Sequence, residues 1–215
     1  MKFGLVAGEA SGDVLGAGLI RALRQQLPEA RFEGVAGPAM VAAGCEQWEP
    51  SDSLAVMGLV EPLRHVPRLL RLRRELHRRW QASPPDVFIG IDAPDFNLGL
   101  ETQLRRAGIR TAHYVSPTIW AWRAGRVNKV RAAADTVLCI LPFEPEIYAR
   151  HGVDAVFVGH PKATGGNAGQ CGGAYRARPG GRAFRHAAGN AGPAEGLCLA
   201  HRRRGSGRPF HAGRR

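Results

Sequence analysis

The chain has 215 residues, enough for one large or two small domains, and 44% of them are hydrophobic, which excludes wholesale disorder. It has no apolar run of eighteen residues and no secretory leader pattern at residues 1–8, so we expect neither a membrane-spanning helix nor export from the cytoplasm. The four cysteines are widely spaced without a C-x-x-C pair, and we therefore expect no zinc site, no other metal site and no disulfide framework.

Over residues 1–161, short apolar runs typical of buried strands alternate with segments whose apolar residues have helical spacing. Asp13 is a candidate cap for the first helix, and Gly108 ends the last. Strands are predicted at 2–7, 31–36, 86–91, 109–115, 135–140 and 154–158, and helices at 13–26, 67–80 and 98–107. The alternation predicts an α/β fold: a Rossmann-like, doubly wound parallel sheet whose ligands lie beyond the carboxyl ends of the strands.

The loop after the first strand, residues 8–13, is rich in glycine and leads into a helix, as in many anion sites. It has neither the Walker A lysine nor the G-x-G-x-x-G spacing. The carboxylates of Glu9 and Asp13 would repel a pyrophosphate but suit sugar hydroxyls. The alternative is that Asp13 only caps the helix and the glycines only form the turn.

A second polar loop, residues 90–97, follows a buried strand directly and contains Asp92, Asp95 and Asn97. A carboxylate at this place can act as a general base on a hydroxyl group. Asp95 or Asn97 can alternatively cap the next helix, but that does not account for both aspartates.

A third loop, residues 114–123, contains Ser116, Trp122 and Arg123. Tryptophan can stack on a sugar ring, although packing in the core is the commoner role for a single tryptophan. Arg123 either contacts a phosphate or is only solvated.

Residues 54–79 combine a wide apolar face with seven arginines between positions 64 and 79. Helices that lie on anionic membranes have this pattern. The alternative is an ordinary helix packed on the sheet with its arginines in water. We favour the membrane interpretation, because the apolar residues before Pro67 exceed what one packed face needs.

The segment 162–215 differs from the rest of the chain. Residues 163–215 carry a net charge of +9 out of the total of +12, and Gly, Ala, Arg and Pro make up 37 of these 53 residues. Codons for these four amino acids begin with two G or C bases, so a GC-rich gene read out of frame would give this composition. We interpret the segment as a disordered Gly/Arg-rich tail produced by a frameshift; a genuine nucleic-acid-binding tail is the alternative.

Taken together, the loops resemble the lipid-A-disaccharide synthase family. The resemblance spans residues 1–161 and stops at Pro161. The matching stretches, in the order of the family, are LVAGEASGD (5–13), LGAGLIRAL (15–23), GVAGP (34–38), LAVMGLVE (54–61), PDVFIGIDAPDFN (85–97), HYVSPTIWAWR (113–123), LPFE (141–144) and VGHP (158–161).

The resemblance implies the N-terminal half of a glycosyltransferase-B architecture without a metal or other cofactor. It implies inverting transfer of 2,3-diacylglucosamine from UDP to 2,3-diacylglucosamine 1-phosphate, with Asp92 as the general base. The substrate-binding residues that it implies are Glu9, Ser11, Asp13, Asp95, Asn97, Ser116, Trp122 and Arg123. The apolar residues implied to touch the membrane or acyl chains are Met57, Leu59, Val60, Leu63, Val66, Leu69 and Leu70.

The resemblance further implies a peripheral protein on the cytoplasmic face of the inner membrane and a homodimer for a full-length form only. The family continues after Pro161 with a second domain that residues 162–215 do not resemble, so we expect this chain to be truncated and inactive. We weighed three alternatives: a non-catalytic membrane-associated fragment, a nucleotide-sugar epimerase and a nucleic-acid-binding module. The last is disfavoured because aromatic residues are sparse in the tail.

Overall fold

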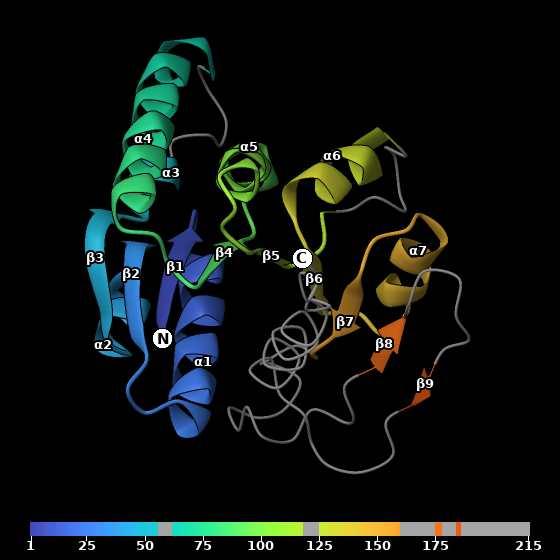
Figure 1. The fold of residues 1–215 in the computed structure, drawn as a ribbon. Helices are drawn as coiled ribbons and strands as arrows, with labels where there is room; N and C mark the ends of the chain where they lie inside the picture. The colour runs from blue at the N-terminus through green and yellow to red at the C-terminus, as the bar shows by residue number, and fades with distance from the viewer. Residues whose placement is uncertain (56–61, 118–124, 160–174, 178–183, 186–215) are drawn as a thin grey trace, which may run out of the picture.

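The computed structural model describes residues 1–55, 62–117, 125–159, 175–177 and 184–185 (Figure 1). The strands are β1 (Lys2–Ala7), β2 (Arg31–Ala36), β3 (Cys45–Pro50), β4 (Val87–Ile91), β5 (Thr111–Tyr114), β6 (Thr136–Cys139), β7 (Ala155–Phe157), β8 (Tyr175–Ala177) and β9 (Phe184–Arg185). The helices are α1 (Ala10–Gln26), α2 (Pro38–Ala42), α3 (Asp52–Ala55), α4 (Pro62–Ala82), α5 (Pro94–Arg106), α6 (Gly125–Ala133) and α7 (Glu144–Arg150).

The strands form one sheet in the order β3-β2-β1-β4-β5-β6-β7-β8-β9. The first seven in this order pair in parallel, and β8 and β9 add to the β7 edge in antiparallel fashion. The order runs outward in both directions from the adjacent strands β1 and β4, which is the doubly wound arrangement that the sequence predicts.

Helices cover both faces of the sheet, with α1 and α2 on one face and α4, α5 and α6 on the other (Figure 1). Because side chains alternate along a strand, β1 supplies both cores: Leu5 packs in the cluster with α1, and Val6 packs in the cluster with α4 and α5. The strands are therefore buried on both sides and read as continuous apolar runs, as parallel strands do.

Glycines on the α4/α5 face let bulky side chains lie directly on the backbone of the sheet. A Cβ atom on Gly4 of β1 would lie 3.0 Å from the indole ring of Trp80, which is fully buried. A Cβ on Gly90 of β4 would lie 2.1 Å from Oε1 of Glu101 and 2.8 Å from Cβ of Asn97. The space that these glycines leave is thus filled by residues from α4 and α5.

All three predicted helices begin earlier than expected. α1 begins at Ala10 rather than 13, and α4 begins at Pro62, which places Pro67 inside the helix although proline normally interrupts a helix. α5 begins at Pro94 rather than 98, because proline fits the first helical position. Seven further elements were not predicted: β3, α2, α3, α6, α7 and, within the segment predicted to be disordered, β8 and β9. Apart from the longer α6 they have two to seven residues, too short for a clear periodic pattern.

Asp13 does not cap α1, which corrects the expectation from the sequence. It lies in the fourth position of the helix and is 5% exposed. Its carboxylate accepts hydrogen bonds from the backbone N–H groups of Gly37, Ala39 and Met40, at 2.8–3.0 Å. Asp13 therefore caps the start of α2 and joins the loop after β2 to the first turn of α1.

Of the segment 162–215, the described residues are those of β8 and β9, and the remainder lies outside the described residues. No helix in the described ranges combines the length and apolar character that a membrane crossing requires.

Candidate functional site

The loops after β1 and β4 meet where the strand order reverses. Val6 pairs with Gly90 and Ala7 with Ile91, so the two strands end level with each other. A Cβ on Gly8 would lie only 2.6 Å from that of Ala93, so the two loops are in close contact. This is the place where open α/β sheets bind their ligands.

Backbone strain is concentrated at the ends of β4 and β5. Asp92 and Ala93 have φ values of 52° and 41°, and Val115, directly after the neighbouring strand, has a φ of 76°. The left-handed region costs about 1–2 kcal/mol for a residue with a Cβ, and more for a β-branched one such as valine. Strain of this kind persists where the surrounding structure enforces it, commonly at functional sites.

The predicted base lies in this strained turn. Asp92 is partly exposed, and its backbone N–H donates to the carbonyl of Tyr114 at 2.8 Å, which fixes it to the end of β5. Glu9 and Ser11 are exposed at the start of α1, in the loop that contacts this turn. The structure thus brings Asp92, Glu9 and Ser11 to one edge of the sheet, where two carboxylates and a hydroxyl can contact a polar ligand.

Asp95 lies one turn further, in the first turn of α5, with its side chain 72% exposed. Arg126 of α6 lies 3.5 Å from its carboxylate, and Arg73 of α4 donates to its carbonyl oxygen at 3.1 Å. Two arginines from flanking helices therefore converge on the start of α5. Neither Asp95 nor Asn97 caps α5, because the N-cap position is Ala93, so that alternative is wrong.

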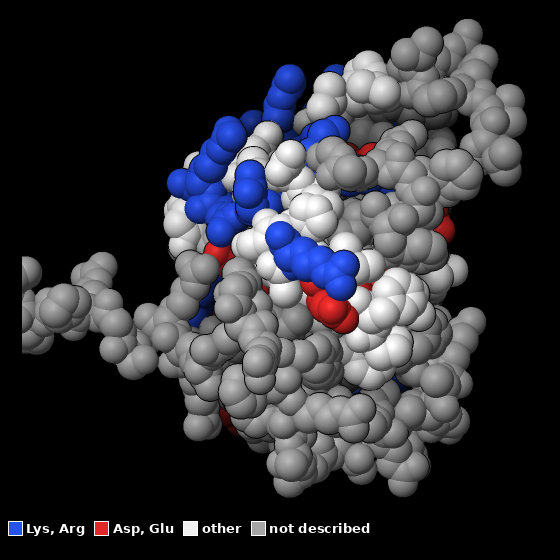
Figure 2. Space-filling view, turned by 90° about the vertical axis from the view of Figure 1, so that its right-hand side faces the viewer, with Lys and Arg blue, Asp and Glu red and all other residues white. Residues whose placement is uncertain are grey.

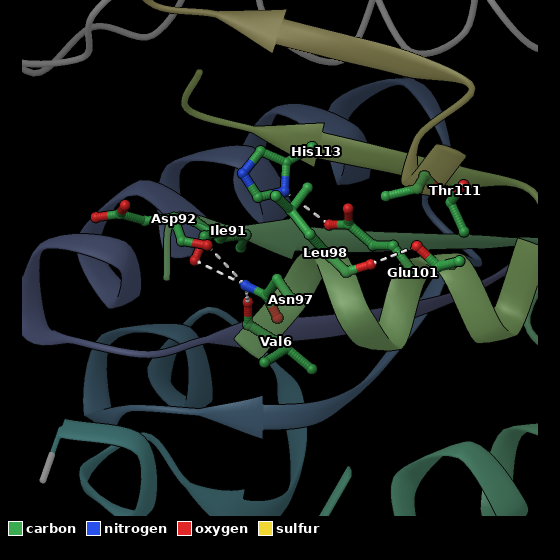
Figure 3. Close-up of polar contacts among 10 residues, drawn as sticks. Val6, Ile91, Asp92, Asn97, Leu98, Glu101, Thr111 and His113 are labelled. Carbon is green, nitrogen blue, oxygen red and sulfur yellow. Dashed lines mark hydrogen bonds and ion pairs between the residues drawn. The ribbon is translucent and has the colours of Figure 1, made fainter. Parts of the chain in front are cut away.

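Asn97 is fully buried, which places it away from any ligand surface. Its Nδ2 donates to the carbonyl oxygens of Asp92 (2.8 Å), Ile91 (3.3 Å) and Val6 (3.3 Å) (Figure 3). Its amide is used by the ends of β1 and β4, so the structure does not bring Asn97 to the exposed edge where Asp92, Glu9 and Ser11 lie. The sequence does not reveal that Asn97 is buried, because a polar residue that follows two aspartates in a loop is normally expected to be exposed.

Ser116 follows the strained Val115 and is half-buried. Its hydroxyl lies 2.9 Å from that of Tyr148 in α7, which joins the loop after β5 to α7. Burial raises the pKa of the Tyr148 phenol, so it is protonated and able to donate at neutral pH. Trp122 and Arg123, also predicted at this site, lie outside the described residues.

A buried acid–base pair lies behind the site, and sequence reasoning missed it. Oε1 of Glu101 in α5 is 2.7 Å from Nδ1 of His113 in β5, and both side chains are fully buried (Figure 3). Burial raises the pKa of the Glu101 carboxyl, an effect that the neighbouring His113 opposes. The isolated glutamate in a helix and the isolated histidine in a strand gave no signal that they would meet.

Of the predicted membrane residues whose side chains the structure describes, two are exposed and one is buried. Val66 and Leu70 of α4 are 42% and 39% exposed, whereas Leu69 is 7% exposed and packs in the core. Leu69 lies on the helix face turned to the sheet, so the structure does not bring it to the surface with Val66 and Leu70. Met57, Leu59 and Val60 lie outside the described residues, as does the side chain of Leu63.

Basic side chains also gather on the side of the molecule that carries α6 and α7 (Figure 2). Exposed members from α5 and α6 are Arg106, Lys129 and Arg131. Some charge on this side is neutralised, since Arg105 pairs with Asp135 at 3.1 Å. Within the part of the chain that the structure describes, no three His, Cys, Asp or Glu side chains are grouped to hold a metal ion.

A doubly wound parallel sheet with polar, strained loops at the reversal of its strand order defines a Rossmann-like ligand-binding domain. The family described as lipid-A-disaccharide synthetase matches residues 3–164, which is most of the chain. The chain therefore belongs to the lipid-A-disaccharide synthetase family.

Curated relatives are similar over the same part of the chain. The lipid-A-disaccharide synthase of Xanthomonas campestris pv. campestris strain 8004 is 60% identical over 162 residues, which are 75% of this chain and 37% of that protein. Those of Serratia proteamaculans and Alkalilimnicola ehrlichii are 59% and 58% identical over 163 residues, 76% of this chain and 43% of each. The chain thus matches less than half the length of these relatives.

Among solved structures, the UDP-GlcNAc 2-epimerase of Neisseria meningitidis bound to UDP-GlcNAc superposes with a TM-score of 0.49 at 9% identity. The superposition covers 71% of this chain and 44% of that one. A likeness at this level carries no functional inference.

The Glu101 carboxyl should make stability depend on pH. Its pKa in the folded chain is raised above the ordinary value of 4.5, so the neutral form stabilises the fold. That contribution is complete below pH 4.5 and is lost as the pH rises through the raised pKa. Measured by urea unfolding, the free energy of unfolding of the chain relative to a Glu101→Gln variant should therefore fall from pH 4.5 to neutrality.

The matched control is Glu146→Gln, since the Glu146 carboxylate is 62% exposed and pairs only with Arg150 on the surface. The free energy of unfolding of the chain relative to Glu146→Gln should show no such fall between pH 4.5 and neutrality. Parallel pH profiles for the chain and Glu101→Gln would contradict the interpretation.

Proposed function

We propose that residues 1–161 form the acceptor-side domain of a lipid-A-disaccharide synthase. In the proposed reaction, 2,3-diacylglucosamine passes from UDP to the 6-hydroxyl of 2,3-diacylglucosamine 1-phosphate, with inversion at the anomeric carbon. The acceptor hydroxyl loses its proton to a base as it attacks, and UDP leaves. Membership of the family supports this proposal, together with the polar loops at the end of the sheet.

The single observation that carries the assignment of a base is the position of Asp92. It is a partly exposed carboxylate in a strained turn at the reversal of strand order, in contact with the loop that holds Glu9 and Ser11. A carboxylate fixed there can take a proton from a bound hydroxyl. In this proposal Glu9, Ser11, Asp95 and Ser116 bind the acceptor sugar, whereas Asp13 shapes the loop through its bonds to the start of α2.

Asp92 can be tested in a chimera that joins residues 1–161 to the remaining part of the Xanthomonas campestris relative. We expect the chimera to transfer the sugar from UDP-2,3-diacylglucosamine to 2,3-diacylglucosamine 1-phosphate. Asp92→Asn should lower turnover by about 100-fold or more, because general-base catalysis contributes at least this much.

Asp86→Asn is the matched control, since Asp86 lies just before the other end of β4 and accepts a hydrogen bond from the backbone N–H of Lys2. Its turnover should stay close to that of the parent chimera. An Asp92→Asn chimera as active as this control would refute the assignment of the base.

We further propose that the segment 162–215 is a frameshift product and that the chain by itself lacks synthase activity. The family match ends at residue 164, and the composition changes at the same place: residues 163–215 contain no Val or Ile. Groups that stabilise the departing UDP would come from the part of the relatives that this chain does not match.

Resequencing the gene from codon 150 onward tests the frameshift. We expect a single inserted or deleted base near codon 162 whose correction opens a frame similar to the rest of the relatives. Purified chain should show no turnover with both substrates. An intact frame together with turnover by the chain would overturn this proposal.

We also propose that α4 docks on the cytoplasmic surface of the inner membrane. Val66 and Leu70 are exposed apolar residues within a helix that also exposes Arg68, Arg71 and Arg74. Exposed apolar groups bordered by arginine suit an interface of acyl chains and anionic headgroups. The basic segment 162–215 is identical in the variants described next, so a difference in binding between them reports on α4.

Binding to anionic vesicles, measured by cosedimentation, should weaken by about tenfold in a Val66→Ser, Leu70→Ser variant, because less apolar area can leave water. Val14→Ser is the control: Val14 is 52% exposed, but it lies on α1, on the other face of the sheet. Equal binding by the two variants would contradict docking through α4.

A further inference from the structure

We infer that Asn97 is a positioning residue for Asp92: its buried amide holds the turn after β4 in the left-handed conformation that presents the Asp92 carboxylate. The inference rests on the proposed function only for the role of that carboxylate. The geometry of the turn is independent of the reaction.

The amide of Asn97 joins three chain segments with one nitrogen atom. Nδ2 carries two N–H bonds and lies within 3.3 Å of the carbonyl oxygens of Val6, Ile91 and Asp92. The shortest of these contacts, 2.8 Å, is to Asp92 itself. Val6 and Ile91 lie near the ends of the adjacent parallel strands β1 and β4, so the amide ties these two strand ends to α5.

The bond to the Asp92 carbonyl acts where the backbone is strained. Asp92 and Ala93 both have positive φ, and the strand turns into α5 at Pro94. This bond is partly shielded from water, and rotating the turn to an ordinary conformation would move the Asp92 carbonyl away from the amide and break it. The amide of Asn97 therefore stabilises the left-handed conformation of Asp92 and Ala93 through a hydrogen bond, and not only by filling space in the core.

The surroundings fix the amide in place. Asn97 lies on α5 against Gly90 of β4, where a side chain on the strand would collide with its Cβ at 2.8 Å. The next turn of α5 is anchored by the bond between Glu101 and His113 of β5. Figure 3 shows Asn97 between the strand ends, with the carboxylate of Asp92 pointing away from the amide. Asn97 thus holds the backbone and leaves the carboxylate free.

The test follows the sign of φ at Asp92 and Ala93 in the isotope-labelled full chain by NMR. The intraresidue amide–Hα NOE and the one-bond Cα–Hα coupling both report a left-handed residue. We expect the left-handed signature in the parent chain and its loss in Asn97→Leu, which keeps the volume but has no donor. Thr102→Val is the control on the same helix, since the Thr102 hydroxyl bonds only to Leu98 within α5; it should keep the signature.

Asn97→Asp separates hydrogen bonding from packing and decides the matter if Asn97→Leu does not fold. Burial raises the pKa of a carboxyl group, so the pH is raised until the new side chain is ionised; it then has no proton to donate, and the signature should be lost. Protonation at low pH restores one donor and should restore the signature, while the parent chain keeps it throughout. A left-handed signature that persists in Asn97→Leu, or that is indifferent to pH in Asn97→Asp, would overturn the inference.

The outcomes distinguish this inference from the proposed function. If the Asp92→Asn chimera stays active while the turn depends on Asn97, the assignment of the base fails and the positioning role remains. If the chimera loses turnover while the turn ignores Asn97, the base stands and the positioning role fails.

Discussion

The site depends on the close approach of two loops at the ends of β1 and β4. Parallel pairing brings these strands to the same edge, but the loops can touch only because the first one lacks side chains at the contact. Gly8 lies against Ala93, where a Cβ would be only 2.6 Å from the Cβ of Ala93. A larger residue at Gly8 would push the start of α1 away from Asp92, so the absence of a side chain at Gly8 sets the width of the site.

The polar residues of the matching motifs divide into buried residues that bond to the backbone and exposed residues that a ligand can reach. Asp13 and Asn97 are buried, and each satisfies backbone groups that would otherwise lose their hydrogen bonds. Asp92, Glu9 and Ser11 remain partly or fully exposed and are the groups able to meet a ligand. Residues 90–97 therefore contain both the proposed base, Asp92, and the buried Asn97 that bonds to its backbone, and the sequence of the motif alone does not separate the two roles.

The sequence was sufficient for the parallel doubly wound sheet, because strands buried on both faces give unbroken apolar runs such as Lys2–Ala7, whose bounds were predicted as observed. It also placed the polar loops at the carboxyl ends of the strands. It failed where a long-range contact decides the outcome. Asp13 has every property of a helix cap but reaches residues 37–40, and Glu101 meets His113 from another element. Neither contact has a local signature.

The contacts that fix Asp92 all come from residues 1–161. Its backbone is held by Asn97 and by the carbonyl of Tyr114, and the loop beside it is held by the bond of Asp13 to the start of α2. None of these bonds needs a second domain. The turn that holds Asp92 is therefore fixed by contacts among the described residues of this sheet, and under the proposal above an absence of turnover would be assigned to the groups around the departing UDP. For the same reason residues 1–161 suit the chimera proposed above. The added part of the relative has to supply the groups around UDP, whereas the turn at Asp92 is already held by this part of the chain.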